Sequence, residues 1–228
     1  DRIADDLLRD PDAPVAPTLQ IVMTRLWRSN EREFSRKTYL ELSNEGLLLD
    51  DFLTRQLETL RTTAPTASEN GLVLDMLNHH STDKRTARLV SNDALVERYR
   101  QLAASYVKRV ARACCDVALL VETSDGTRLA HDTLAASVRR RFDESMAAAQ
   151  RASRILENRR TGWLDGSTGP TLDAFDLAQV EQGLNGRAAL CEPERRLIAA
   201  SRQVRKRAVR LRRLLIGLAL AVVALILA

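Results

Sequence analysis

The sequence predicts a mainly α-helical protein that carries one short β-hairpin. Hydrophobic residues make up 45% of the 228 residues but aromatic residues only 4%, which is the profile of a helical protein. Several stretches repeat apolar residues every three or four positions, as one face of a helix requires. Apolar residues alternate beside the turn sequence Ser124-Asp125-Gly126, and this pattern predicts the hairpin.

The first part of the chain, residues 1–65, is expected to form a small helical domain. Thr18 can cap a helix that continues through Trp27, after the break made by the preceding prolines. Two more helices are predicted over residues 37–43 and 47–61. Residues 62–70 are rich in Thr, Ala, Ser and Pro, so we expect a loop and an internal domain boundary there.

Residues 66–160 have the element order of a winged-helix domain, in which three helices precede a hairpin called the wing. Asn92 or Asp93 is expected to cap the second helix. The expected elements are helices over 71–80, 92–100 and 101–115, a short strand over 86–90, the hairpin over 115–129 and a closing helix from residue 132.

His131 lies where the hairpin is predicted to end and the closing helix to begin. Asp132 or Thr133 is expected to cap that helix, which is predicted to continue to about Asn158. The positive end of a helix dipole would place free N–H groups and an imidazole beside one another, an arrangement suited to an anion. The alternative is a structural histidine at a strand–helix joint. The apolar stripe of the helix is Leu134, Val138, Phe142 and Met146.

The sequence Ala130-His131-Asp132 at this place resembles the Met-His-Asp signature of STAND signalling ATPases, a family that includes the NACHT and apoptotic-ATPase types. Alanine replaces the methionine, whereas the histidine and the acid match. The resemblance implies that His131 reaches the β-phosphate of bound ADP and helps to hold the protein inactive.

Two further segments resemble bacterial STAND proteins, so that the resemblance extends from about Val15 to Arg213. Residues 17–27 are similar to the proline-led helix that follows the P-loop core, which implies that Pro17 packs on the adenine ring. A first-turn proline that merely starts a helix is the alternative. Residues 161–213 are expected to be a helical tail, and its part from Leu190 to Arg202 resembles the tail that follows the winged helix in the family.

The formal net charge of +5 is concentrated in one segment. Seven basic residues and no acid lie between Arg202 and Arg213, and without them the net charge would be about −2. The predicted third helix carries Lys108, Arg109 and Arg112, which could contact DNA phosphates. We do not expect a nucleic-acid partner, because such residues usually form a solvated face, but a membrane-tethered winged-helix transcription regulator remains the alternative function.

The C-terminal residues 214–228 are all apolar or glycine, and they follow the basic segment directly. A membrane-spanning helix needs about 20 such residues, so we expect the start of a transmembrane helix that is truncated here. The positive-inside rule places the preceding residues in the cytoplasm, anchored to the inner (plasma) membrane. A buried core helix or an oligomer contact is the alternative.

The sequence contains no Walker-type glycine-rich loop and no catalytic set. No metal site is predicted, because the adjacent residues His79 and His80 point about 100° apart on a helix. The chain begins at Asp1, and we expect a P-loop core of the same protein, holding ADP or ATP and Mg²⁺, to precede it. The resemblance thus implies a regulatory arm that senses the nucleotide and, when released, allows homo-oligomerisation.

Overall fold

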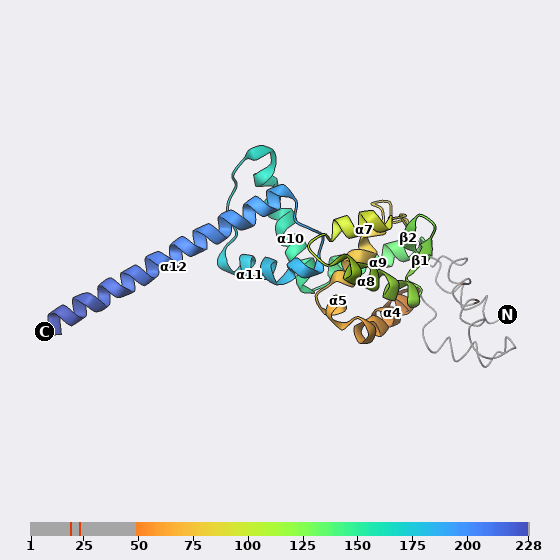
Figure 1. Cartoon of the computed structure of the whole chain (residues 1–228), viewed down its shortest axis with the longest axis horizontal. Coiled ribbons are helices and arrows are strands. Elements are labelled where there is room, and N and C mark those ends of the chain that lie inside the picture. The colour runs from red at the N-terminus through yellow and green to blue at the C-terminus, as the bar shows by residue number, and fades with distance from the viewer. Residues whose placement is uncertain (1–18, 20–22, 24–48, 228) are drawn as a thin grey trace. The chain divides into compact units, whose positions relative to one another are not determined.

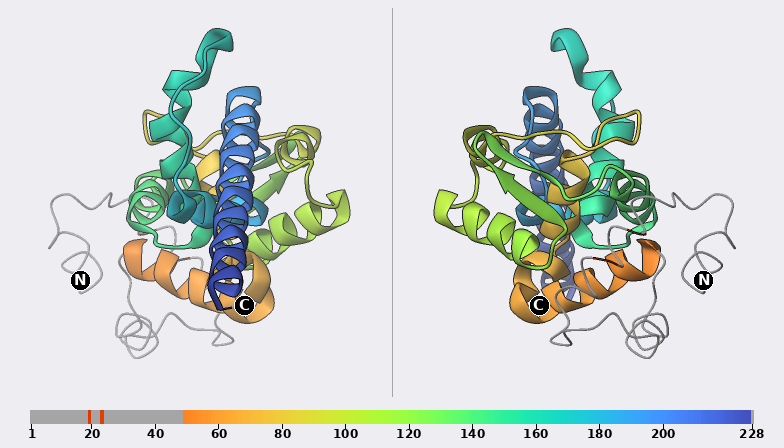
Figure 2. Two further views of the ribbon diagram at one scale, coloured as in Figure 1. Left: turned by 90° about the vertical axis from the view of Figure 1, so that its left-hand side faces the viewer. Right: turned by 90° about the vertical axis from the view of Figure 1, so that its right-hand side faces the viewer.

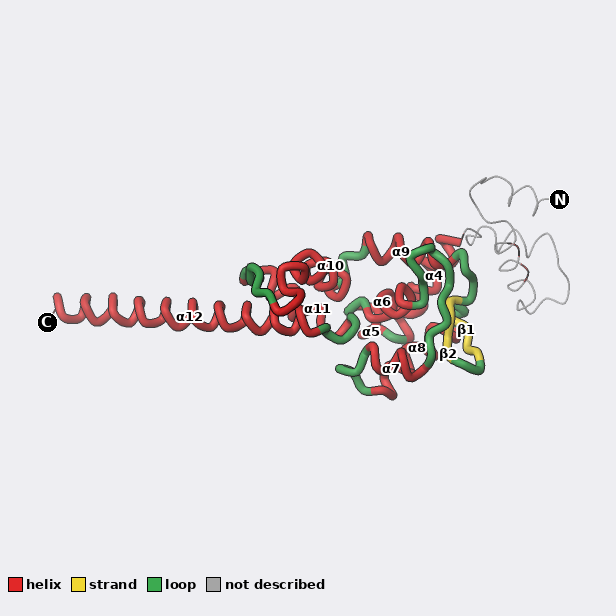
Figure 3. The backbone as a smooth tube through the Cα atoms, turned by 90° about the horizontal axis from the view of Figure 1, so that it is seen from above, coloured by secondary structure: helices red, strands yellow, loops and turns green. Residues whose placement is uncertain are grey.

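The computed structural model describes residues 19, 23 and 49–227. Within residues 49–227 the regular structure consists of nine α-helices, two short 3-10 helices and one two-stranded antiparallel hairpin, so this part is mainly α-helical as predicted (Figure 1; Figure 3). The chain divides into two compact units after Ser145. This division does not coincide with the boundaries expected at residues 65/66 and 160/161. Leu19 and Met23, in the helix predicted from Thr18, are helical, whereas Pro17 and the helix predicted over 37–43 lie outside the described residues.

The described part of the first unit consists of six helices and the hairpin. Five of these helices precede the hairpin, and the sixth closes the unit. In order these elements are α4 (Leu49–Thr63), α5 (Pro65–Glu69), α6 (Leu72–His79), α7 (Asn92–Arg98), α8 (Ala104–Asp116), β1 (Leu120–Thr123), β2 (Gly126–Leu129) and α9 (Leu134–Glu144).

The segment 62–70, expected to be a loop and a boundary, is instead helical and packed. Residues 62 and 63 end α4, and α5 begins at Pro65, where proline fits the first turn because its missing N–H is not needed. Ala67 of α5 lies in the same apolar core as Leu60 of α4 and Leu72 of α6. The local composition signalled a turn, but burial of Ala67 stabilises a helix there.

The hairpin pairs Leu120 with Leu129 and Thr123 with Gly126. The strand expected over 86–90 is reduced to isolated bridges, of which Val90 with Thr127 attaches the preceding loop to β2. Gly126 has φ +151°, and a Cβ built there would lie 2.1 Å from the Val90 carbonyl oxygen, so only glycine allows this approach. Helix α8 packs beside β1, and in Figure 2 the green hairpin runs along the yellow-green helix.

Helix α9 begins where predicted but ends much earlier. Leu134 and Val138 are fully buried, as the apolar stripe requires. Ser145 adopts an extended conformation with ψ 133°, which breaks the helix, so the chain does not continue in one helix to Asn158. Met146 is 71% exposed and therefore does not belong to the buried stripe.

The second unit is built from three helices around a separate apolar core. Helix α10 crosses α11, and both pack against the first turns of the long helix α12. Two short 3-10 helices connect them. The elements are α10 (Ala148–Arg160), η1 (Thr161–Gly166), α11 (Ala174–Gly183), η2 (Leu184–Gly186) and α12 (Glu192–Leu227). The core includes Trp163, Leu177, Val180, Leu197 and Ile198.

Helix α12 joins the basic segment and the apolar C-terminal residues in one continuous helix. One face of its first turns is buried as far as Ser201, and every residue from Arg202 to Gly217 is exposed. No helix in the described part of the chain has the length and apolarity that crossing a membrane requires. The transmembrane helix expected from residue 214 is therefore not found there.

Candidate functional site

His131 lies in the bend between β2 and α9, as the sequence predicted, and its side chain is partly buried. Burial lowers the pKa of the imidazole below its usual value, and the neighbouring Asp132 carboxylate opposes this shift. The ring is therefore neutral at physiological pH. Within the described part of the chain, no hydrogen bond holds the His131 side chain. A neutral imidazole with a free edge remains available for a ligand.

Of the two residues expected to cap α9, Asp132 does not lie at the N-cap position. Its Oδ1 atom instead accepts a hydrogen bond of 3.0 Å from the backbone N–H of Ala87, which lies in the loop after α6. Thr133 occupies the N-cap position in a helical conformation, and its hydroxyl is buried without a hydrogen-bond partner among the described residues. The carboxylate therefore fixes the position of the junction and leaves the helix N-terminus without a side-chain cap.

Some backbone N–H groups at the junction between β2 and α9 have no hydrogen-bond acceptor among the described residues. The N–H of Leu134 donates to the His131 carbonyl at 3.1 Å, and that of Ala135 donates to the Asp132 carbonyl. No partner within the described residues accepts from the backbone N–H groups of Asp132 and Thr133. Two free amides and one neutral imidazole thus lie together at the positive end of α9, an arrangement that favours an anion.

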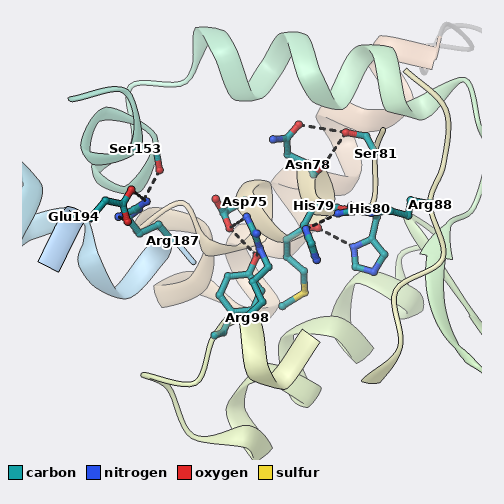
Figure 4. A network of polar contacts seen from close by, with 12 residues as sticks. Asp75, Asn78, His79, His80, Ser81, Arg88, Arg98, Ser153, Arg187 and Glu194 are labelled. Atoms are coloured by element: carbon teal, nitrogen blue, oxygen red, sulfur yellow. Dashed lines mark hydrogen bonds and ion pairs between the residues drawn. The ribbon is translucent and has the colours of Figure 1, made fainter. Parts of the chain in front are cut away.

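The other two histidines have structural roles. The buried His80 donates from Nδ1 to the Met76 carbonyl at 2.8 Å and accepts at Nε2 from the Thr127 hydroxyl at 2.9 Å. Burial lowers its pKa to about 4. Arg88 donates to Nδ1 of His79 at 2.6 Å, and burial lowers the pKa of His79 to about 3 (Figure 4). Among the described residues, no group of three metal-binding side chains lies together.

A buried polar network, which the sequence did not predict, joins α6 and α7. The Tyr99 hydroxyl donates to Oδ2 of Asp75 at 2.7 Å, and Arg98 donates to the same atom at 3.4 Å (Figure 4). Tyr99 is fully buried. Burial, followed by the Asp75 charge, raises the pKa of the Tyr99 hydroxyl well above its usual value, so the phenol stays protonated. The network joins the two helices. Asp75 and Tyr99 are 24 positions apart, so no local sequence pattern predicts their hydrogen bond.

The basic face of α8 is partly neutralised. Arg112 forms ion pairs of 3.2 Å with both Asp116 and Glu122. The guanidinium of Arg109 stacks over the ring of Tyr106 at 5.3 Å. Lys108 is the remaining exposed cation of this face for which the described residues provide no partner. The helix thus offers few free charges to DNA phosphates.

A second candidate site lies in the other unit, between α11 and α12. It is an open groove of about 700 Å³ lined mainly by basic side chains of α12. The sequence showed the cluster of basic residues but not the groove, because α11 closes one side of it.

Comparisons of the chain with protein-family models, with curated proteins and with solved structures found no match.

Proposed function

We propose that this chain is the regulatory arm of a STAND-type signalling ATPase, in which the first unit is a winged helix that senses ADP and ATP. The order α6, α7, α8 and hairpin, with Val90 bridged to Thr127, supports the winged-helix interpretation. The observation that carries the proposal is His131, whose neutral and unpartnered imidazole lies beside two free amides at the start of α9.

The proposed mechanism is a two-state switch. In the inactive state His131 donates a hydrogen bond to the β-phosphate of ADP, and the amides of Asp132 and Thr133 support the same anion. Pro17, which lies outside the described residues, contacts the base, while the P-loop core of the same protein holds Mg²⁺ and the nucleotide. Exchange for ATP favours the released form, which assembles into a homo-oligomer. The chain itself supplies contacts and no catalytic group.

Attachment to the cytoplasmic face of the inner membrane is a separate part of the proposal. The exposed residues Leu214, Leu215 and Ile216 follow the basic segment on the same helix. Apolar side chains next to cations suit the boundary between acyl chains and headgroups. The C-terminal part of α12 therefore attaches the protein to the membrane.

The decisive experiment identifies small molecules released from the natural full-length protein after gentle purification in detergent. We expect ADP in the wild type and a loss of affinity of about tenfold to a hundredfold in His131→Ala, because a hydrogen bond to a charged group contributes roughly 1.5–3 kcal/mol. Arg128→Ala is the matched control, since Arg128 is exposed on the neighbouring strand.

Equal ADP occupancy in His131→Ala and wild type would contradict the role of His131. A wild-type protein that carries no nucleotide and binds none would remove the STAND interpretation. Salt-dependent binding of duplex DNA would then favour the transcription-regulator alternative.

A further inference from the structure

The groove in the second unit is formed by one face of α12 and the end of α11. Residues 202, 205, 206, 209, 210 and 213 repeat at the three- and four-residue spacing of a single helical face. Leu177 and Glu181 of α11 form the opposite wall. The complete lining is Leu177, Glu181, Arg202, Arg205, Lys206, Val209, Arg210 and Arg213.

The charges of the groove are unbalanced. Glu181 is its one acidic lining residue, and it is paired with Arg202 at 2.7 Å. Within the described part of the chain, the other four basic residues of the lining make no ion pair. They are Arg205, Lys206, Arg210 and Arg213, and all four are exposed. Uncompensated cations on one face attract phosphate groups, and guanidinium groups can bind phosphate oxygens in pairs.

The same helix face leads directly into exposed apolar surface. Val209 lies within the groove and is 44% exposed, and Ile216, three residues after Arg213 on the same face, is 51% exposed. Phosphate-binding and apolar surfaces therefore lie next to each other along α12. A partner that satisfies both must carry an anionic group joined to hydrocarbon.

We propose that the groove between α11 and α12 binds the headgroups of anionic phospholipids, with the acyl chains against the apolar C-terminal part of α12. The groove volume of about 700 Å³ accommodates a phospholipid headgroup. This inference rests on the membrane attachment proposed above and is independent of the nucleotide switch. It adds a lipid class and a site to that attachment.

Phospholipid fits the surface better than the other polyanions. DNA or RNA would neutralise the cations but leave the exposed Ile216 in water. An acidic peptide would offer carboxylates without a matching hydrocarbon chain. An anionic phospholipid supplies both a phosphate group for the cations and an acyl chain for the apolar residues.

The test is flotation of the full chain with vesicles of phosphatidylcholine alone and with vesicles that also contain phosphatidylglycerol. The site variant is R205Q/R210Q. The control is R207Q/R212Q, which removes two arginines from the same part of α12 but outside the groove lining. Both variants change the net charge equally, so a difference between them reports the position of the charges.

We expect phosphatidylglycerol to increase wild-type binding and R205Q/R210Q to reduce this increase about 25-fold, since each basic residue that contacts an anionic surface contributes about fivefold. R207Q/R212Q should retain most of the increase. Equal losses in both variants would overturn the groove site, because they would reveal only a general effect of charge.

The outcomes of the flotation experiment distinguish the headgroup site in the groove from membrane attachment in general. Binding to phosphatidylcholine vesicles without any increase from phosphatidylglycerol would overturn the headgroup site and leave membrane attachment intact. Binding to neither kind of vesicle would overturn both. Binding of duplex DNA that R205Q/R210Q abolishes, without lipid binding, would overturn the lipid proposal in favour of a nucleic-acid surface.

Discussion

His80 illustrates how burial sets the protonation state of a single residue. The Met76 carbonyl accepts only from a protonated Nδ1, which fixes the tautomer and leaves Nε2 to accept from Thr127. A positive charge on this fully buried ring would lose its hydration. The histidine therefore links α6 to the hairpin in its neutral form.

We predict that the first unit loses stability on mild acidification. The pKa of His80 is about 4 in the folded state and about 6.5 when exposed, so the unfolded chain binds more protons between these values. Stability therefore falls as the pH falls through this range, by about 2 kcal/mol between about pH 7 and about pH 5 for this residue. Urea unfolding at both pH values measures the loss.

The variant His80→Gln should be less stable at both pH values but should show a smaller difference between them. His79 remains in the variant and retains its own contribution, so the difference is reduced and not abolished. The same pH dependence in the variant and the wild type would contradict the assignment to His80.

The sequence predicted the position of His131 but not the environment of its neighbours. Asp132 precedes a helix, and this position normally predicts an N-cap. Its actual partner is the N–H of Ala87, which is 45 positions earlier in the chain. Local patterns report local hydrogen bonds, so a tertiary partner of this kind leaves no mark in the sequence.

At the scale of elements, the crossing of α10 and α11 depends on a glycine. A Cβ atom added to Gly183 would lie 2.2 Å from the Ala148 carbonyl oxygen and 2.6 Å from the Ala152 Cβ. The two helices are thus in contact through backbone atoms. The backbone of Gly183 has φ −89°, which any residue can adopt. Glycine is therefore required there because a side chain would have no space.

Gly183→Ala is expected to destabilise the second unit by about 1–3 kcal/mol, because the helices must separate to admit the methyl group. Thermal unfolding followed by circular dichroism measures the change. Gly217→Ala is the matched control, since a Cβ there meets nothing within 4 Å and alanine favours the helix. An unchanged midpoint in Gly183→Ala would show that the crossing can relax.

Elements with strong periodicity were the most predictable. The helices predicted over 71–80 and from residue 132 correspond to α6, in which Leu72 and Leu77 are buried, and α9, in which Leu134 and Val138 are buried. Helix α5 was missed because its five residues are too few for a periodic pattern. The break at Ser145 was missed because the four-residue spacing of apolar residues in α9 continues in the sequence to Met146, which is exposed in the structure.

At the scale of the whole molecule, each unit has its own apolar core. The second unit also contains a buried ion pair, in which Arg187 donates to Glu194 at 2.9 Å and 3.3 Å. Glu194 accepts the Cys191 N–H as well. Burial opposes ionisation, but the hydrogen bonds from Arg187 prevail and lower the pKa of the carboxyl group.

We predict that Glu194→Gln destabilises the second unit by about 3–5 kcal/mol, because the buried Arg187 guanidinium loses its ion pair with the Glu194 carboxylate. Hydrogen exchange should show reduced protection in α10, α11 and the start of α12, with unchanged protection in α6, α8 and α9. Glu192→Gln, which removes an exposed ion pair with Arg195, is the control. Reduced protection in both units would show that the chain unfolds as one cooperative body.

The length of α12 beyond the core has a mechanical consequence. From Arg202 to Leu227 the helix extends for about 39 Å at 1.5 Å per residue. A rotation of about 10° at Ser201, where the buried part ends, would therefore displace the far end by about 7 Å. The Leu172 N–H donates to the Ser201 hydroxyl at 2.9 Å, and a small rearrangement at this contact would be amplified along the helix as along a lever.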